Sequence, residues 1–584
     1  MNNKKSHFFT IVSFLIFWCS VSYSQNYYVS TLGSDSNNGL SIGTAWRTIQ
    51  HAVDNIGPGA TVNILGGEYN ERIEIFVSGT AADPIVIKNF DGNPAIIDGT
   101  GATATWDAML AIFDQDYITI EGLVIRDNVK NNAQGILIEG DCQNITIRNN
   151  EIYNISYDAV VDNNPCPNKN SQPIIVYGSA NNAITDLSIE NNIIRDCNVG
   201  CSEGVAINGY VDRFTVSKNQ VFNINNIGID IIGGEGVGPS GNDFARGGFV
   251  TNNEVYNCKS PYATAAGIYS DGASDIFIEN NIVHDNQWGI EVGCENVGFT
   301  SFLITVQNNF IYNNEDAGLS IGGFDFPATS GKVSSSSIVN NTLYNNDTNQ
   351  GGLSGITGDV SLSYTEFTTI TNNIVLSTNQ SNLILYEDNV NSLGLNLDYN
   401  MYYLLSDPTN PEWEFGGLIY QNLSAYQAGT SLEANSFYVD PLLEDLSIFD
   451  LHLSSSSPAI DQGFNNFFNG LLDIDGDARI LFGTIDIGAD EYTGLVTPTD
   501  TNIEVSPICI EVLYDPTPTL VTLDGNFSDA TIDILDGSMV SIFTVTQQNG
   551  PYTIDTTLLG GGTHFVRISS NTFPELFLIQ MIKP

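Results

Sequence analysis

A short phrase that sets apolar residues on either side of a polar pair returns about every 30 residues along the chain. It reads ITIRNNEIYN in an early copy and IFIENNIVHD further on. The second asparagine of the pair stands at Asn150, Asn192, Asn219, Asn253, Asn281, Asn309, Asn341 and Asn373. In a parallel β-helix these residues stack at a tight turn, where each amide bonds the next and satisfies the buried backbone groups. The repeat therefore predicts an all-β, parallel β-helix.

A second alternating phrase follows each asparagine pair after a loop of variable length. It reads GILIE at 135, GIDII at 228 and GIEVG at 289. Strict alternation is typical of a strand with one buried face. The positions expected to point into the core are Ile136, Ile174, Val205, Ile229, Ile268, Ile290 and Leu319, and the residue after each should point outward. Each coil then has three short strands, and the variable loops are where function is usually placed.

The pattern also marks the ends of the array. The stretch TAWRTIQHAVDNIGPGA has helical spacing at Trp46, Ile49 and Val53, which predicts a helical cap over the first rung. The asparagine ladder fades after about residue 380. We divide the chain into a signal peptide (1–24), the β-helix (25–430), a closing module (431–495) and a small C-terminal β-sandwich-like domain (496–584).

Composition agrees with a long all-β array, because 15% of the residues are charged and 55 are glycine. Lys4 and Lys5, the apolar run 8–18 and the small polar stretch 20–24 have the layout of a secretory signal, so we expect export. Loss of the two lysines takes the formal charge from -49 to about -51, which excludes nucleic acid as a partner. The remaining cysteines enter an oxidising compartment, and the sequence leaves their pairing open.

The stretch YYVSTLGSDSNNGLSIGTAWRTIQHAVD, followed by the asparagine repeats, carries a resemblance to a known superfamily. Over about residues 26–400 the chain resembles the pectate-lyase-like right-handed β-helix proteins, many of them secreted carbohydrate-active enzymes of Bacteroidota. The resemblance implies a right-handed β-helix and activity on a polysaccharide or oligosaccharide. The same fold also hosts lyases, hydrolases, epimerases and phage spikes, so the activity is less specific than the fold.

The tail resembles the C-terminal sorting domain of type IX secretion cargo. The stretch VLYDPTPTLVTLDG matches the start of that family at Tyr514 and Pro516, and LLGGGTHFVRI matches its closing strands at Gly561. Asp515 and Pro518 depart from the family pattern, and an ordinary β-sandwich or carbohydrate-binding module is the alternative. The resemblance implies a secreted or cell-surface protein that uses the type IX secretion machinery, and we expect a monomer.

Candidate chemistry gathers on the outward face of the second strand of each coil. One column of consecutive rungs presents Ala206, Asp230, Tyr269, Glu291 and Ser320, and the next column presents Asn208, Ile232, Asp271 and Gly293. Because rungs stack about 4.8 Å apart, Asp230 and Glu291 should lie about 9 to 10 Å from each other, with Tyr269 between them. The loops around these strands add Glu235, Arg246, Lys259, Glu295 and Asp325.

The leading interpretation is β-elimination on a uronic-acid-containing glycan, in which a base removes the C5 proton while a cation neutralises the adjacent carboxylate. Candidate bases are Lys259, Tyr269 and His284. The neutraliser is either Arg246 or a Ca²⁺ ion held by the acidic group Asp230, Asp271, Glu291 and Glu295. The residues expected to contact the substrate are Asn208, Asp271, Glu295, Asp325 and His284. The reaction either cleaves an internal linkage or expels water from a terminal uronate.

Charge bears on this interpretation, because a chain near -51 repels an anionic polysaccharide. Elimination therefore predicts a metal requirement unless Arg246 and Lys259 suffice.

Two other interpretations stay open. Glycoside hydrolysis needs two carboxyls about 6.5 to 9.5 Å apart for inversion, and the expected gap between Asp230 and Glu291 is near the upper end of that range. In the third interpretation, the acids form a solvated or calcium-stiffened wall of a non-catalytic binding or structural module. His284 has its own alternative, because it stands where other coils have Tyr256 or Tyr312 and is more simply a stacking residue.

Overall fold

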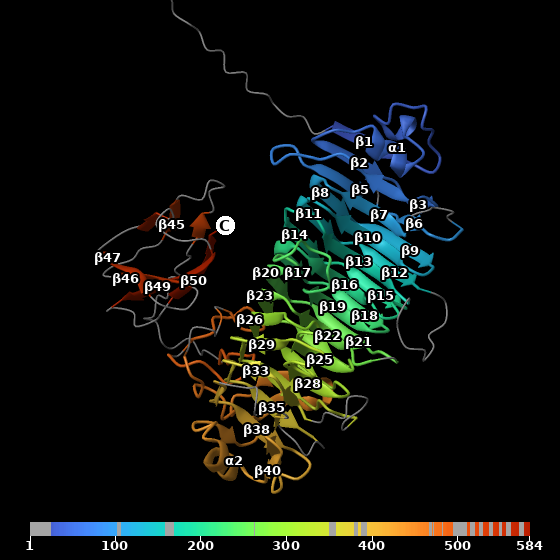
Figure 1. Ribbon diagram of the computed structural model, residues 1–584. Coiled ribbons are helices and arrows are strands. Elements are labelled where there is room, and N and C mark those ends of the chain that lie inside the picture. Colours follow the sequence, from blue (N-terminus) through green and yellow to red (C-terminus); the bar gives the residue numbers. More distant parts are fainter. Residues whose placement is uncertain are drawn as a thin grey trace, which may run out of the picture.

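The computed structural model shows a tall stack of coils with three parallel sheets along its length (Figure 1). It describes residues 25–494 except 91, 102–106, 158–168, 262, 350–357, 379–383, 387–393, 466–469, 471 and 482. Only the backbone is described for β36 and for the strands beyond residue 494. The signal peptide predicted over 1–24 therefore lies outside the described residues. Among the described residues, the helices are too short or too polar to span a bilayer.

Sheet C, the 11-stranded sheet, carries the second alternating phrase of each coil. Its strands are β4 (Ile73–Ile75), β7 (Ala108–Phe113), β10 (Ala133–Glu139), β13 (Ser171–Gly178), β16 (Glu203–Gly209), β19 (Ile227–Ile232), β22 (Ala266–Asp271), β25 (Trp288–Gly293), β28 (Ala317–Ile321), β32 (Val360–Leu362) and β36 (Ile384–Tyr386). The predicted inward column is confirmed, because Val205, Ile229 and Ile268 pair in register and are fully buried. These side chains fill the centre of the coil.

Sheet A, with 15 strands, receives the chain after sheet C. Its strands are β1 (Gln25–Val29), β2 (Ala60–Ile64), β5 (Ile85–Asn89), β8 (Asp116–Glu121), β11 (Gln143–Arg148), β14 (Ile184–Glu190), β17 (Val211–Ser217), β20 (Arg246–Thr251), β23 (Ser274–Glu279), β26 (Thr300–Gln307), β29 (Lys332–Ser334), β30 (Ser337–Val339), β33 (Thr365–Glu366), β34 (Thr369–Thr371) and β37 (Asn396–Asp398). Its Ile and Val side chains pack on the same central core.

Sheet B has 13 strands and follows the asparagine pair. Its strands are β3 (Gly67–Tyr69), β6 (Ala95–Asp98), β9 (Leu123–Val129), β12 (Glu151–Ser156), β15 (Ile193–Cys197), β18 (Gln220–Ile224), β21 (Glu254–Cys258), β24 (Ile282–His284), β27 (Phe310–Tyr312), β31 (Thr342–Tyr344), β35 (Ile374–Ser377), β38 (Met401–Leu404) and β41 (Phe437–Tyr438).

The asparagine ladder is confirmed at the turn between sheets A and B. Asn281 is representative: its backbone N–H and side-chain amide donate to Asn309 Oδ1 at 2.9 and 3.0 Å, and its amide also donates to Val250 O at 2.9 Å. The first residue of each pair adopts the left-handed conformation, with φ of 56° at Asn280 and 55° at Lys218. The ladder runs further than expected, because Asn373 bonds Asn400 in the same way.

Both ends of the stack are closed by short helices. The predicted N-terminal cap is confirmed as α1 (Ile49–Asp54), which buries Ile49 and Val53 and begins at an N-cap, Thr48, that accepts from His51 N–H. A 3₁₀ turn, η1 (Ile42–Thr44), precedes it. At the other end lie the hairpin β39 (Trp413–Phe415) and β40 (Leu418–Tyr420) and the helix α2 (Leu423–Thr430).

After β41 adds a last strand to sheet B, the closing module folds back along the β-helix. It contains β42 (Leu443–Asp445), the turn η2 (Leu446–Ile448) and β43 (Asp450–Leu453). The first asparagines of three pairs hold it: Asn280, Asn308 and Asn372 donate their side-chain amides to Asp473 O, Leu472 O and Phe464 O. The first asparagine of these three pairs thus has a docking role that differs from the ladder role of the second.

The C-terminal part consists of antiparallel strands, in agreement with a small separate β-domain. They form a three-stranded and a four-stranded sheet: β44 (Glu511–Leu513), β45 (Leu520–Asp524), β46 (Ala530–Asp536), β47 (Ser541–Gln547), β48 (Tyr552–Asp555), β49 (Gly562–Ser570) and β50 (Phe577–Lys583). Tyr514, Pro516 and Gly561, on which the sorting-domain resemblance rests, lie outside the described residues.

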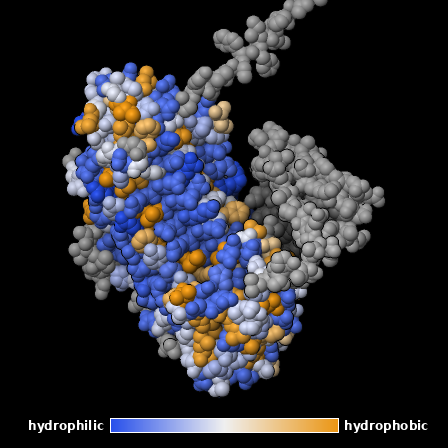
Figure 2. Space-filling model, turned by 180° about the vertical axis from the view of Figure 1, so that it is seen from behind, coloured by the Kyte–Doolittle hydropathy of each residue, from blue (hydrophilic) through white to orange (hydrophobic). Residues whose placement is uncertain are grey.

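One face of the β-helix is largely hydrophilic. Figure 2, a view from behind, shows a face on which hydrophilic side chains predominate over the length of the β-helix. Among the described cysteines, Cys142, Cys197, Cys258 and Cys294 are free and buried, whereas Cys201 is in a disulfide.

Candidate active site

The predicted outward column on sheet C forms as expected. Asp230 of β19 pairs with Tyr269 of β22, and Tyr269 pairs with Glu291 of β25. Asp271 lies two residues beyond Tyr269 and pairs with Gly293. The stacking of identical short strands therefore brings together side chains that are about 30 residues apart in the sequence.

The carboxyl groups of this cluster are unusually buried for an outward face. Asp230 and Asp271 are each 4% exposed, and one oxygen of Asp230 has no hydrogen-bond partner. Burial raises the pKa of Asp230 well above its usual range, and the negative charges of Glu203, Asp271 and other nearby acids raise it further. An unpaired buried charge of this kind is costly, so the site favours a proton or a bound cation.

Loops above the strands close the cluster from outside. The backbone N–H of Glu295 donates to Asp271 Oδ1 at 2.7 Å, and Asn296 donates its side-chain amide to Glu235 Oε1 at 2.6 Å. Burial raises the pKa of Glu291 well above its usual range, with added repulsion from Glu295 and Asp271. Glu295 and Glu235 thus form an exposed acidic rim over the buried acids.

Glu203 belongs to this cluster although the alternation pattern did not reveal it. Simple alternation puts Glu203 on the same side as Val205, which points into the core. A Cβ on Gly204, however, would meet the core residues Val221 and Ile224, so two successive positions face inward at this corner. The break turns Glu203 outward, where burial and the charges of Glu295 and Glu235 raise its pKa to about 8. The glycine before most of these core residues, as at Gly204, Gly228 and Gly267, was the available signal.

Tyr269 points outward, as predicted. Its hydroxyl lies where a side chain on Gly293 would stand, at 2.8 Å from an added Cβ, so glycine is needed at that position. Tyr269 packs with Trp288, Ala266 and Ile227 and is 4% exposed. Burial and the charges of Asp271 and Glu291 raise its pKa well above the usual range. Tyr269 therefore keeps its proton and suits proton donation better than proton abstraction.

The two predicted cations have partners elsewhere. Arg246 begins β20 on sheet A, where its Nε lies 3.4 Å from Asp212 Oδ2 and its guanidinium 4.8 Å from the centre of the Tyr210 ring. Lys259 Nζ lies 2.8 Å from Glu315 Oε1. Among the described residues, no ion pair joins a Lys, Arg or His to the carboxyl cluster. The structure thus removes the geometric basis for Arg246 or Lys259 as its counter-charge.

His284 lies on sheet B, in a stack of rings. Its ring is 5.0 Å from that of Tyr256 and 4.7 Å from that of Tyr312, with planes within 8° of parallel. Its Nδ1 lies 2.7 Å from Asp285 Oδ2 and its Nε2 lies 3.7 Å from Glu254 Oε1. The stacking interpretation of His284 is confirmed, and this position on another sheet does not serve a substrate in the sheet C cluster.

Two predicted substrate contacts lie at the edges. Asn208 is buried and stands in the same column as Asp271, with Ile232 on the rung between them. Its Oδ1 has no hydrogen-bond partner. Asp325 is exposed in the loop after β28, where Thr329 donates to its Oδ2 at 3.0 Å. Asn208 remains well placed to meet a ligand, whereas Asp325 is engaged within its own loop.

A cation fits the sheet C cluster on chemical grounds. Asp230, Asp271, Glu291 and Glu295 offer only hard oxygen donors, which Ca²⁺ prefers. The unpartnered, buried oxygen of Asp230 is the specific observation in its favour. Among the described residues, these four do not gather three ligand atoms within 4.8 Å of one another, so side chains would have to move before more than two of them could hold one ion.

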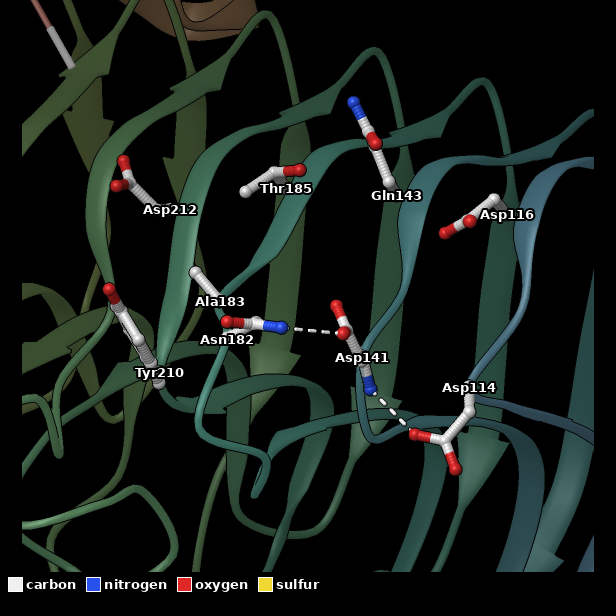
Figure 3. Close-up of a pocket in the computed structure, with 9 residues that line it drawn as sticks. All are labelled: Asp114, Asp116, Asp141, Gln143, Asn182, Ala183, Thr185, Tyr210 and Asp212. Atoms are coloured by element: carbon white, nitrogen blue, oxygen red, sulfur yellow. Dashed lines mark hydrogen bonds between the residues drawn. The ribbon is translucent and has the colours of Figure 1, made fainter. Parts of the chain in front are cut away.

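A separate open pocket of about 750 Å³ lies on sheet A and at the corner before it (Figure 3). Its lining residues are Asp114, Asp116, Asp141, Gln143, Asn182, Ala183, Thr185, Tyr210 and Asp212. Asn182 donates to Asp141 Oδ2 at 2.7 Å, and the backbone N–H of Asp141 donates to Asp114 Oδ1 at 2.8 Å. The pocket is acidic, but it lacks the deep burial of the sheet C cluster, so we place the candidate active site on sheet C.

Comparison with known proteins agrees with this architecture. The chain matches the family model "Pel9A-like, right handed beta helix region" over residues 27–191 and the model "Right handed beta helix region" over residues 174–330. These matches define a pectate-lyase-like, right-handed parallel β-helix protein. The chain is also 36% identical over 449 residues to the "Uncharacterized protein YwoF" of Bacillus subtilis, covering 74% of this chain and 91% of that protein. The chain therefore belongs to the same family as YwoF.

More limited similarities extend to pectate lyases and to XylC. The chain is 38% identical over 99 residues to "Pectate lyase PEL9" of Emericella nidulans, an alignment that covers 16% of this chain and 24% of that enzyme. Among solved structures, pectate lyase Pel9A covers 81% of this chain and 97% of its own, with 17% identity and a TM-score of 0.39. The complex of XylC with xylose covers 80% and 98%, with 11% identity and a TM-score of 0.47.

Proposed function

We propose that this protein is a carbohydrate-active enzyme whose active site is the carboxyl cluster on the outer face of sheet C. The observation that carries the proposal is the buried, unpaired carboxyl of Asp230 among Glu203, Asp271 and Glu291. Perturbed titratable groups gathered in this way mark functional sites more often than structural ones. The sequence similarity to the Pel9A-like region supports a glycan as the substrate.

The reaction we propose is β-elimination on a uronic-acid-containing glycan. Glu203, with a pKa of about 8 and partial exposure, is suited to take the C5 proton, while Tyr269 is suited to protonate the leaving oxygen. The electron pair of the broken C5–H bond forms the C4–C5 double bond as the C4–O bond breaks. A Ca²⁺ bound by carboxylates from the group Asp230, Asp271, Glu291 and Glu295 would supply the positive charge that neutralises the uronate carboxylate.

Glycoside hydrolysis is the second candidate. Asp230 and Glu291 are separated by the rung of Tyr269, hence by about 10 Å, slightly more than inverting carboxyl pairs require. The high pKa of Glu291 favours this candidate, because a protonated carboxyl can serve as the general acid.

One assay separates the candidates. The purified protein is incubated with a panel of uronate-containing and neutral glycans, and both the ultraviolet absorbance of unsaturated uronate and the release of reducing ends are followed. Elimination produces the chromophore, whereas hydrolysis produces reducing ends without it. Absence of both signals across the panel would leave a carbohydrate-binding module, which direct binding measurements on the same glycans would identify.

Metal dependence is tested in the same assay. Prolonged treatment with a chelator should abolish product formation, and added Ca²⁺ should restore it. Full activity after complete metal removal would refute the role proposed for Ca²⁺.

We also propose that the chain is exported by the type IX machinery to the cell surface or medium and acts there as a monomer. Localisation of a tagged chain in strains with and without that machinery tests the export.

A further inference from the structure

The closing module contains a second group of ligand-type side chains, far from the sheet C strands in sequence. His452 lies on β43, Asp475 in the loop 473–477 and Asp490 near the end of the module. One ligand atom from each of these three side chains lies within 4.8 Å of the other two. Three segments of the module therefore converge on one point.

The two ring nitrogens of His452 have different surroundings. Nδ1 lies 2.5 Å from Asp450 Oδ1, an arrangement that fixes the ring orientation. Nε2 lies 3.1 Å from Asp475 Oδ2, yet this buried nitrogen has no hydrogen-bond partner, because the contact lacks hydrogen-bond geometry. Two donors that share an ion at about 2.1 Å each are separated by roughly 3.0 to 3.4 Å. The contact thus has the spacing of two ligands of one metal.

The acidic ligands are held in place by hydrogen bonds of their own. Buried Asp473 accepts from the backbone N–H groups of Asp475 and Asp477 through Oδ1 and from that of Glu491 through Oδ2. Asp490 is 6% exposed and accepts from Leu453 N–H at 2.7 Å. Asp473 therefore ties the loop of Asp475 to the segment of Asp490, so the backbone that carries both carboxylates is positioned before any ion arrives.

We propose that His452, Asp475 and Asp490 bind a first-row divalent metal ion such as Zn²⁺, with Asp450 orienting the imidazole ring. A histidine hydrogen-bonded to a carboxylate through its other nitrogen is the usual arrangement at such sites. One nitrogen and two carboxylate oxygens suit Zn²⁺ or Mn²⁺ better than Ca²⁺, which takes oxygen ligands. The site is independent of the glycan chemistry proposed for sheet C, and its ion would fasten the three segments of the closing module.

The test is metal binding to the full-length mature chain, stripped of metal and measured by calorimetry with Zn²⁺, Mn²⁺ and Ca²⁺ in turn. Asp475→Asn removes the exposed carboxylate while keeping its shape, and it should weaken Zn²⁺ binding at one site per chain by at least about 30-fold. Asp477→Asn is the matched control, because Asp477 is an exposed acid of the same loop outside the ligand set. Its Zn²⁺ affinity should stay within about twofold.

Two further readouts make the result decisive. Substitution with Co²⁺ should give visible absorption bands in the wild type that His452→Gln abolishes, which assigns the nitrogen ligand. Zn²⁺ should raise the melting temperature of the wild type and of Asp477→Asn but not of Asp475→Asn. Zn²⁺ binding of equal strength in wild type and Asp475→Asn would overturn the proposal. So would a wild type without Zn²⁺ binding, since His452 would then be a protonated partner of its acids.

Discussion

Two rows of buried polar side chains run along the same stack of coils, and they differ in how their groups are satisfied. In the asparagine ladder, the amide of Asn281 donates to two oxygens and its Oδ1 accepts from Asn253. In the sheet C cluster, Asp230 faces other acids, and one of its oxygens has no partner. Both rows are built by the same register, so the contrast lies in chemistry and not in architecture.

The contrast separates structural from functional burial. A neutral amide that fills both its donor and acceptor capacity stabilises the coil, because no buried group is left unpaired. Buried like charges do the opposite, since each ionisation opposes the next. The turn thus pairs its buried polar groups, whereas sheet C retains buried carboxyl groups that repel one another. A ligand bound on sheet C is the simplest explanation for their retention.

The largest effect is expected at Asp230. Asp230→Asn removes the charge while keeping the shape, and it should reduce kcat/KM on the glycan that gives product by about 1,000-fold, or about 4 kcal/mol. Folding should be unaffected or slightly favoured in metal-free protein, because a repelled buried charge is lost. Ser320→Ala, in the same column beyond Glu291, is the control and should change kcat/KM by less than about threefold. Activity retained by Asp230→Asn would move the active site elsewhere.

Next in size is the loss of one ladder residue. Asn281→Ala leaves the acceptor Val250 O and the N–H groups of Asn253 without their partners, so it should lower the free energy of unfolding by about 3 kcal/mol. The measurement is urea unfolding followed by circular dichroism. Asn252→Gly, at an exposed left-handed position with φ of 56°, should cost less than about 0.5 kcal/mol. Equal costs at the two positions would show that the ladder bonds do not carry the difference.

A smaller effect should appear in the pH dependence of stability. The pKa of Glu203 is raised from 4.5 to about 8, so the folded state keeps a proton that the unfolded state has lost between these values. Stability should therefore fall as pH rises through this window and level off above pH 8. Glu203→Gln should reduce that fall by on the order of 1 kcal/mol, as measured by thermal unfolding at several pH values without metal. A pH profile identical to that of the wild type would mean that Glu203 is already ionised.

The smallest effect is expected at His284. His284→Tyr places in the stack the residue that neighbouring coils already use, so stability should change by less than about 0.5 kcal/mol and kcat/KM by less than about twofold. A large loss of activity with unchanged stability would return His284 to the list of substrate contacts. The variant thus tests whether sheet B takes part in the chemistry.

How far the sequence predicts the molecule depends on whether a feature follows the repeat. The ladder and the column of Asp230, Tyr269 and Glu291 were predictable, because a fixed coil converts spacing along the chain into stacking. Glu203 was missed because the inward turn of Gly204 breaks the alternation. The reach of the ladder to Asn400 was missed because its phrase, LDYNMYYL, lacks the paired asparagine.

Features outside the repeat were not predictable from spacing. Arg246 begins β20 after a loop of variable length and pairs with Asp212 of the neighbouring strand in sheet A, whereas Lys259 follows β21 and reaches Glu315 of a later coil. The return of the closing module along the β-helix likewise depends on contacts more than 90 residues apart in sequence, such as that of Asn372 with Phe464. Composition marked these segments as different from the coils but carried no information about where they lie.

The return of the closing module changes how the coils should come apart. In a linear array each coil touches only its neighbours, so such arrays fray from their ends. Here one continuous segment accepts from Asn280, Asn308 and Asn372, and the backbone N–H groups of its Ala489 and Gly488 donate to Thr342 Oγ1 and Asn372 O. Coils that would unfold one after another in a simple array are instead joined into one cooperative unit. The last part of the β-helix therefore unfolds only when the closing module detaches.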